Sequence, residues 1–209
     1  MAAKRKVREI TKIRRQDILA AAERLFSQKG FNGTTTKALA AKAGVHETIL
    51  FRYFKNKREL YRATVEVKLA RNRPAALAQM EQAAEQRDDR RFFEALAIGL
   101  LTRFEEDPSI PRLILHSALD GHEPPKLAAK RQLRVEQPTL DYISRRIREG
   151  AFRKIDPQHG VYAFGAMLFG YIVRQQVLGM SKHAKHDRKK IAKDFVTIFL
   201  DGIRKNSRG

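Results

Sequence analysis

The chain has 209 residues, 43% of them hydrophobic, and a formal net charge of +20 at neutral pH. That length accommodates one or two compact domains, and the content of large apolar side chains excludes an intrinsically disordered chain. The excess of positive charge favours a polyanionic partner, although it carries no information about the fold.

Two further features exclude whole classes of protein. Cysteine is absent, which rules out disulfide frameworks, cysteine-based zinc sites and thiol nucleophiles. The apolar stretch 160–173 is shorter than the roughly 20 residues that a membrane helix needs. The basic N-terminus leads into an amphipathic segment, so no secretory signal is recognised and we expect a cytoplasmic protein without a membrane segment.

The positive charge is concentrated in the first third of the chain. Residues 1–62 contain 16 basic and 5 acidic side chains, whereas the remaining 147 residues contain 27 basic and 18 acidic ones. This distribution predicts a basic domain over residues 1–62 and a larger, more neutral domain over residues 63–209.

The spacing of apolar residues indicates helices along the N-terminal third. Ile18, Ala22, Leu25 and Phe26 form one apolar stripe on a first helix that ends before Gly30. A short second helix is expected to begin after a capping Thr34 or Thr35 and to end at Gly44. A third helix is predicted over residues 46–53, followed by a longer one from Lys57. Leu39, Leu50 and Phe54 are expected to be buried.

Helical periodicity continues through the rest of the chain. Further helices are expected over residues 92–104, 110–119, 124–150, 157–179 and 187–205, with Pro138 kinking the third of these or starting a new helix. Alternating strand patterns are not recognised, so the predicted fold is all-α.

The second and third helices have the properties of a helix-turn-helix. Ala40 is small enough for two helices to cross closely, Gly44 permits a left-handed turn, and Leu50 can fix the third helix against the first. The outer face of the third helix is then free to enter a major groove of DNA.

Three ungapped motifs in this region resemble the TetR family of transcriptional regulators. They are Gly30-Phe31-x-x-Thr34-Thr35, Leu39-Ala40-x-x-Ala43-Gly44-Val45 and Leu50-Phe51-x-Tyr53-Phe54-x-Asn56-Lys57-x-x-Leu60. Residues 194–203 are similar to the last helix of that family. The resemblance implies a three-helix DNA-binding domain at the N-terminus, followed by a helical domain that binds a small molecule and forms a homodimer through the last two helices.

The resemblance also assigns DNA contacts to positions of this sequence. It places Glu47, Thr48, Phe51 and Tyr53 at base edges or in the groove, and Thr36, Lys37, Lys55 and Lys57 near phosphates. Lysines that flank a groove-entering helix neutralise phosphates and so support the second assignment independently. The sequence departs from the family at His46, where a capping Ser or Thr is common, and at Phe51, where Tyr is common.

Several alternatives remain open at these positions. Glu47 can accept a hydrogen bond from cytosine or merely favour the helix N-terminus. Phe51 and Tyr53 are either core aromatics or DNA contacts, with the DNA role favoured for Tyr53. The basic run of residues 4–15 is either a solvated tail or an arm that contacts DNA ahead of the first helix.

Enzyme and metal signatures are weak. His183 and His186 lie in a lysine-rich stretch that is read as a solvated loop, and His116 lies on an apolar helix where a core or pocket role is favoured. Gly-rich phosphate loops and Gly-x-Ser-x-Gly or His-Glu-x-x-His motifs are not found. We therefore expect neither an enzyme nor a metal or other cofactor.

Gly160, Gly165 and Gly170 interrupt an apolar helix at a spacing of five residues. Each costs about 1 kcal/mol of helix propensity relative to Ala, which suggests a close approach to a ligand or to another helix. A helix that is apolar on nearly all sides indicates a dimer interface built from the last two helices, with an intramolecular core as the alternative.

Together these features predict a ligand-responsive repressor that binds a pseudo-palindromic operator as a homodimer. The predicted pocket residues are Phe92, Phe93, Leu96, Leu100, Phe104, Leu113, His116, Tyr142, Met167, Tyr171 and Arg174. Their apolar and aromatic character predicts a hydrophobic or amphipathic small-molecule effector. The alternatives are a non-specific nucleic-acid-binding protein and a helical small-molecule carrier or enzyme, which operator competition and ligand binding would distinguish.

Overall fold

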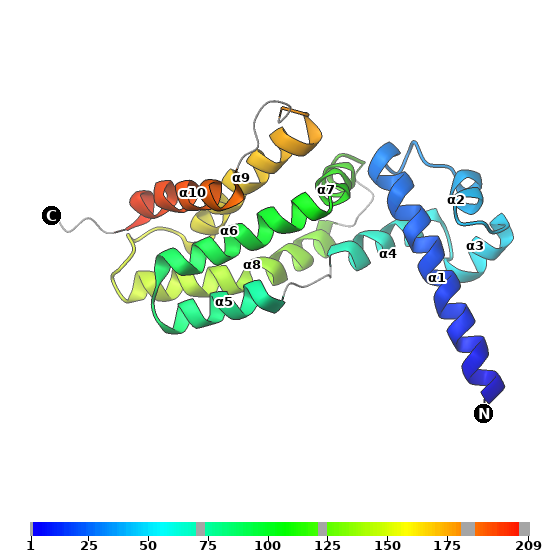
Figure 1. The fold of residues 1–209 in the computed structure, drawn as a ribbon, viewed down its shortest axis with the longest axis horizontal. Helices are drawn as coiled ribbons and strands as arrows, with labels where there is room; N and C mark the ends of the chain where they lie inside the picture. Colours follow the sequence, from blue (N-terminus) through cyan, green and yellow to red (C-terminus); the bar gives the residue numbers. More distant parts are fainter. Residues whose placement is uncertain (1, 70–73, 121–124, 181–186, 205–209) are drawn as a thin grey trace. The chain divides into compact units, whose positions relative to one another are not determined.

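The computed structural model describes residues 2–69, 74–120, 125–180 and 187–204; within these ranges the side chains of residues 2–13, 69, 74, 120 and 125–135 are not described. The described residues form helices, with one isolated β-bridge between Phe152 and Arg204 and no strand (Figure 1). The all-α prediction is confirmed. The chain divides into two compact units, residues 1–72 with 109–124 and residues 73–108 with 125–209.

The first unit, called the N-terminal unit below, contains five helices of the described chain. They are α1 (Ala2–Lys29), α2 (Thr36–Lys42), α3 (Glu47–Tyr53), α4 (Lys57–Leu69) and α7 (Ser109–Asp120) (Figure 1). One hydrophobic core joins them, and the predicted inward positions Leu39, Leu50 and Phe54 all lie in it. At its centre Phe26 packs edge-on against Tyr61, with ring centroids 4.8 Å apart.

The turns of this unit follow from local chemistry. The Thr34 hydroxyl is buried and donates to the Gly30 carbonyl at 2.7 Å, while Thr35 caps α2 by accepting from the Ala38 N–H at 3.1 Å. The two candidate capping threonines therefore have different roles. Gly44 has φ +64°, the left-handed conformation that only glycine adopts without strain, and it reverses the chain between α2 and α3.

The structure differs from the sequence-based expectation at two points. The basic run of residues 4–15 belongs to α1 itself and does not precede the helix, since no glycine or proline interrupts residues 2–29. The expected domain boundary at residue 62 falls inside α4, and α7 packs against α1 and α4. Leu113 of α7 is 1% exposed in the core of the N-terminal unit, which explains why a distant segment belongs there.

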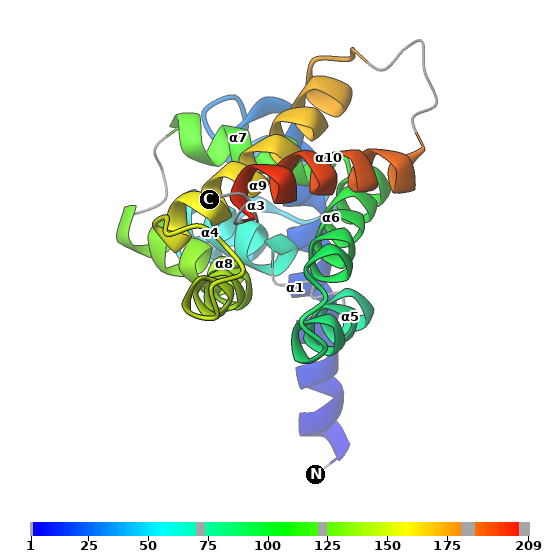
Figure 2. The ribbon, with the colours of Figure 1, turned by 90° about the vertical axis from the view of Figure 1, so that its left-hand side faces the viewer.

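The second unit, called the C-terminal unit, contains the remaining helices. They are α5 (Pro74–Glu85), α6 (Asp89–Glu106), α8 (Pro125–Arg148), α9 (Pro157–Ile172), a π-helical turn (Val173–Val177) and α10 (Arg188–Ile203). Pro138 lies inside α8, which continues through it, so a new helix does not start there. Figure 2 shows α10 passing beside α6 and α9, in agreement with the contacts among the three helices.

Aromatic side chains form the core where α6, α9 and α10 meet. The ring of Phe93 lies 5.0 Å from that of Phe164 and 4.9 Å from that of Phe199, and all three side chains are buried. Phe92 stacks on Tyr142 of α8 with the ring centroids 3.9 Å apart. Such pairs stabilise a core by about 0.5–1.5 kcal/mol each beyond the area that they bury.

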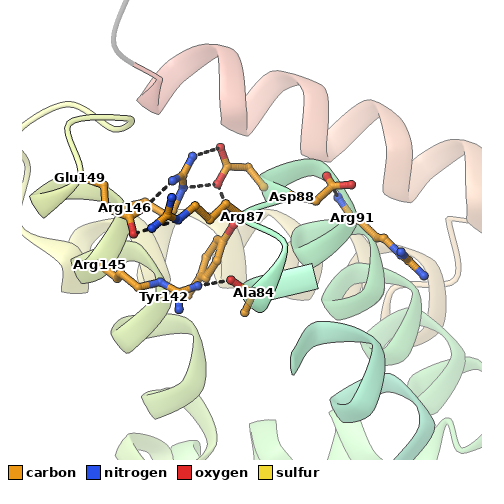
Figure 3. Close-up of polar contacts among 9 residues, drawn as sticks. Ala84, Arg87, Asp88, Arg91, Tyr142, Arg145, Arg146 and Glu149 are labelled. Atoms are coloured by element: carbon orange, nitrogen blue, oxygen red, sulfur yellow. Dashed lines mark hydrogen bonds and ion pairs between the residues drawn. The ribbon is translucent and has the colours of Figure 1, made fainter. Parts of the chain in front are cut away.

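A buried polar network joins the beginning of α6 to the end of α8 (Figure 3). Asp89 accepts from Arg146 at 2.7 Å through Nε and at 3.2 Å through Nη2, and also from the Tyr142 hydroxyl at 2.7 Å. Burial and the hydrogen bond to Asp89 raise the pKa of Tyr142, while the bond to Asp89 raises the pKa of Arg146. Arg146 also binds Glu149, and this hydrogen bond lowers the pKa of the Glu149 carboxyl.

Candidate DNA interface

Helix α3 presents one narrow side to the core and the rest to solvent. Leu50 is fully buried, and at 100° per residue the side of α3 opposite Leu50 carries Thr48 and Arg52. Thr48, Phe51 and Arg52 are exposed, and Glu47 is partly exposed in the first turn. The outer face of α3 is therefore available to a groove-binding partner.

His46 caps α3 although it is not one of the usual capping residues. Its Nδ1 accepts from the Thr48 N–H at 3.4 Å and lies 2.9 Å from the Thr48 hydroxyl. A neutral imidazole that accepts at Nδ1 carries its proton on Nε2, so the same ring retains one donor. The departure from Ser or Thr at this position therefore preserves the cap.

The two aromatic residues of α3 are exposed to different extents. Phe51 is 42% exposed, whereas Tyr53 is partly buried against the core of the N-terminal unit. Phe51 is thus the more accessible ring, in contrast to the sequence-based preference for Tyr53. The reason is helical geometry, because at 100° per residue Tyr53 lies about 60° from fully buried Leu50, whereas Phe51 lies about 100° from it.

The predicted phosphate-contacting residues lie at the starts of α2 and α4. Lys37 is exposed and Thr36 partly exposed at the beginning of α2; Lys55 is exposed in the turn before α4. Lys57 begins α4, and its Nζ lies 4.1 Å from the centroid of the Phe31 ring. This cation–π contact orients the ammonium group and contributes about 0.5–1 kcal/mol.

A groove beside α3 was not foreseen from the sequence. It has a volume of about 590 Å³, and its lining includes Arg14, Val45, His46, Ile49, Arg52 and Tyr53. One side of the groove is formed by α1, and the other side is formed by α3 and the turn that precedes it. Helical geometry alone would have identified Arg52, since it lies on the side opposite Leu50; the proximity of Arg14 depends on how α1 packs.

The predicted pocket residues are distributed over the two units. Leu113 and His116 belong to the N-terminal unit, where Leu113 is part of the core. Phe92, Phe93 and Tyr142 are nearly fully buried against other aromatic rings in the C-terminal unit. The six remaining candidates lie on α6, α9 and the π-helical turn. Phe104 is buried and Arg174 is exposed, and the other four are half-buried: Leu96, Leu100, Met167 and Tyr171.

The three glycines of α9 differ in their surroundings. A Cβ atom at Gly160 would lie 3.1 Å from Ile143 of α8, so this glycine serves packing within the chain. Beyond its own helix backbone, a Cβ atom at Gly165 or Gly170 would meet no heavy atom of the described residues within 4 Å. Close intramolecular packing therefore explains Gly160 alone.

An apolar face is left exposed on α9, the segment after it and α10, and we call it the α9–α10 face. Its exposed members include Tyr162, Leu178, Met180 and Ile198, with exposed fractions between 55% and 62%. Exposed large apolar side chains that adjoin on a surface are typical of interaction sites in soluble proteins.

Metal-binding and membrane-spanning features are not seen in the described residues. In those parts of the chain no three histidine or acidic side chains come together in a metal-binding arrangement. His183 and His186 lie outside the described residues. Within the same ranges, every helix is too short or too polar to cross a bilayer.

Comparison with known proteins identifies the class of the molecule. Residues 18–64 match the family model of bacterial regulatory proteins of the tetR family. The chain is 27% identical over 188 residues to an uncharacterized HTH-type transcriptional regulator, YvkB of Bacillus subtilis, covering 89% of this chain and 95% of that protein. The chain is also 38% identical over 63 residues to the class A tetracycline repressor protein from transposon 1721 of Escherichia coli, covering 30% of this chain and 29% of that protein.

Solved structures show the same fold. A TetR family transcription regulator from Marinobacter aquaeolei superimposes with a TM-score of 0.70 at 17% identity, over 95% of this chain and all of that one. The family model, the curated relatives and the structural neighbours agree. Residues 18–64 therefore contain a tetR-family region with a helix-turn-helix, and the chain as a whole has the fold of solved TetR-family regulators.

Proposed function

We propose that this regulator is a ligand-responsive repressor that acts in the cytoplasm as a homodimer on a pseudo-palindromic operator. The observation that carries the proposal is the exposed outer side of α3, where Thr48, Phe51 and Arg52 project from a helix anchored by fully buried Leu50. A helix held in this way can be inserted into the major groove without disturbing the core. The two α3 helices of a dimer would then contact half-sites about 34–36 Å apart.

The contacts divide into those that position the protein and those that read sequence. Lys37 and Lys55 are exposed cations beside α3 and would neutralise phosphates. Thr48 can hydrogen-bond to base edges, and Phe51 can contact a thymine methyl group. Glu47 would accept from cytosine N4, while its position in the first turn of α3 also favours the helix dipole.

The α9–α10 face supports the dimer. Gly165 and Gly170 leave space on α9 that no atom of the same chain requires, and Ile198 of α10 is 62% exposed. Small residues permit close approach of a partner helix, and burial of apolar side chains would drive association. A second copy of the chain would bury this face in a four-helix interface.

A charge on that face tests the dimer. Ile198→Glu should produce monomers, because the carboxylate would have to be buried between two copies. Leu77→Glu on α5 is the control, since Leu77 is also exposed but lies outside the α9–α10 face. Sedimentation velocity measures both variants; equal dimer fractions in the two would contradict the proposed interface.

The effector site is proposed for the C-terminal unit, along α6, α9 and the π-helical turn. Partly buried residues there, including Leu96, Leu100 and Met167, offer apolar contact area, and Tyr171 offers a hydroxyl. Burial raises the pKa of that hydroxyl, so it stays protonated as a donor. A hydrophobic or amphipathic ligand would release DNA by binding the DNA-free state more tightly than the DNA-bound state.

Selection of duplexes from a random library tests the function as a whole. A specific regulator should enrich an inverted repeat and bind it at least about 10³-fold more tightly than random DNA at the same salt concentration. Uniform binding to all sequences would favour the non-specific nucleic-acid-binding alternative. Ligand binding with no affinity for any duplex would favour a carrier.

A further inference from the structure

We infer that the groove between α1 and α3 binds one backbone phosphate of duplex DNA between the guanidinium groups of Arg14 and Arg52. The inference rests on the proposed DNA-binding function and adds a contact from α1 to those of α3. Arg14 lies on α1, and Arg52 lies on the solvent side of α3; both line the same groove of about 590 Å³.

The charges in the groove require an anion. Among the residues whose side chains are described, its lining includes two arginines and no carboxylate. Among the described residues, neither Arg14 nor Arg52 has an acidic partner or a hydrogen bond. Two like charges facing one space repel each other, and an anion between them converts this repulsion into attraction. Arginine is suited to this role because its planar fork matches the oxygens of a phosphate.

The remaining lining residues fit a phosphodiester better than a free ion. Tyr53 contributes a phenol and His46 an imidazole whose Nδ1 is already occupied by Thr48, so its proton lies on Nε2. Val45 and Ile49 add apolar surface, which a deoxyribose can contact and a hydrated inorganic ion cannot use. The groove also borders the face of α3 proposed to enter the DNA. A strand flanking the major groove is therefore the occupant that this lining favours.

The test compares the wild-type protein with the double variant Arg14→Gln and Arg52→Gln. On both the selected duplex and a random-sequence duplex, the slope of log affinity against log salt concentration should decrease by about 0.9 for each subunit bound. Arg24→Gln is the control because Arg24 is also an exposed arginine of α1 but does not line the groove. It should leave the slope unchanged, and circular dichroism should report the same helical content for all three proteins.

Neutral phosphates locate the contact. Methylphosphonate placed at each position of the duplex in turn should weaken wild-type binding at one phosphate per half-site, and the double variant should be insensitive to substitution at that same phosphate. A merely structural role for the two arginines would not produce this coupling.

Three results would overturn the inference. They are an unchanged salt slope, a change in the selected base sequence with Arg52→Gln alone, and stabilisation by inorganic phosphate that depends on both arginines while the DNA slope does not. Failure of the proposed function is distinct: the wild type would then enrich no sequence, yet the slope on random DNA would still report on the groove.

Discussion

The two units of the molecule both have apolar cores but differ in the side chains that they present to solvent. The N-terminal unit has a core of apolar side chains and presents cations such as Arg14, Lys37 and Arg52 to solvent. The C-terminal unit buries a charged network around Asp89 and exposes apolar side chains, including Ile198, on the α9–α10 face. Surface cations suit a polyanionic partner, whereas exposed apolar side chains suit another protein surface. The contrast indicates which unit faces DNA and which faces a second chain.

The largest expected effects come from the feature that the two units share, an aromatic core. Phe26→Ala in the N-terminal unit and Phe93→Ala in the C-terminal unit should each lower the free energy of unfolding by about 3–5 kcal/mol, because both side chains are fully buried. Urea unfolding followed by circular dichroism measures both. A loss below about 1 kcal/mol for either variant would show that the core of that unit is not the one described.

The next effect comes from the buried charges of the C-terminal unit. Asp89→Ala should destabilise the protein by about 3 kcal/mol, because it leaves the Arg146 guanidinium partly buried without its carboxylate partner. Asp17→Ala is the matched control, since Asp17 is exposed on α1. Urea unfolding of the two variants compares them. Equal stability would mean that the buried network contributes nothing.

Helix caps should have a smaller effect that is similar in both units. Thr35 caps α2 and Asp187 caps α10, each through a side-chain oxygen that accepts from a backbone N–H near the start of the helix. Replacing either by Ala should cost about 1 kcal/mol, as lost capping bonds usually do. Thermal unfolding measures the change, and replacement by Ser at either position should retain most of the stability.

The smallest expected effect is a pH dependence that comes from one carboxyl group of the C-terminal unit. The hydrogen bond from Arg146 lowers the pKa of Glu149 below its ordinary value of 4.5. The stabilisation is therefore complete above pH 4.5 and is lost as the pH falls through the lowered pKa of the folded state. Glu149→Gln should flatten the decline in stability over that acid range relative to the wild type. An unchanged profile would exclude this carboxyl as a contributor.

The order of the helices and the helix-turn-helix were predictable because their determinants are local. Thr35 begins α2 through its hydroxyl, Gly44 ends the same helix through its positive φ, and Leu50 marks the buried side of α3. Each signal lies within a few residues of the feature it sets. The cap formed by His46 was missed because it needs a particular side-chain rotamer and tautomer.

The pocket prediction was less informative because apolar periodicity does not distinguish core from cavity. Phe93 and Leu96 belong to the same helix, yet the first is fully buried among aromatic rings and the second is only half-buried. Leu113 satisfied the same pattern and packs in the other unit. Only the neighbours contributed by other helices decide between these outcomes.

The amino-acid sequence by itself determined the helices, the turn that separates α2 from α3, and the helix-turn-helix motifs that resemble the TetR family. Short-range spacing and backbone preferences specify each of them. Tertiary structure alone decided that α7 packs with the N-terminal unit, that Asp89 meets Arg146 across 57 positions of sequence, and that Arg14 and Arg52 line one groove. These pairings arise where helices distant in sequence pack against one another. A pattern read along one segment contains no information about its partner.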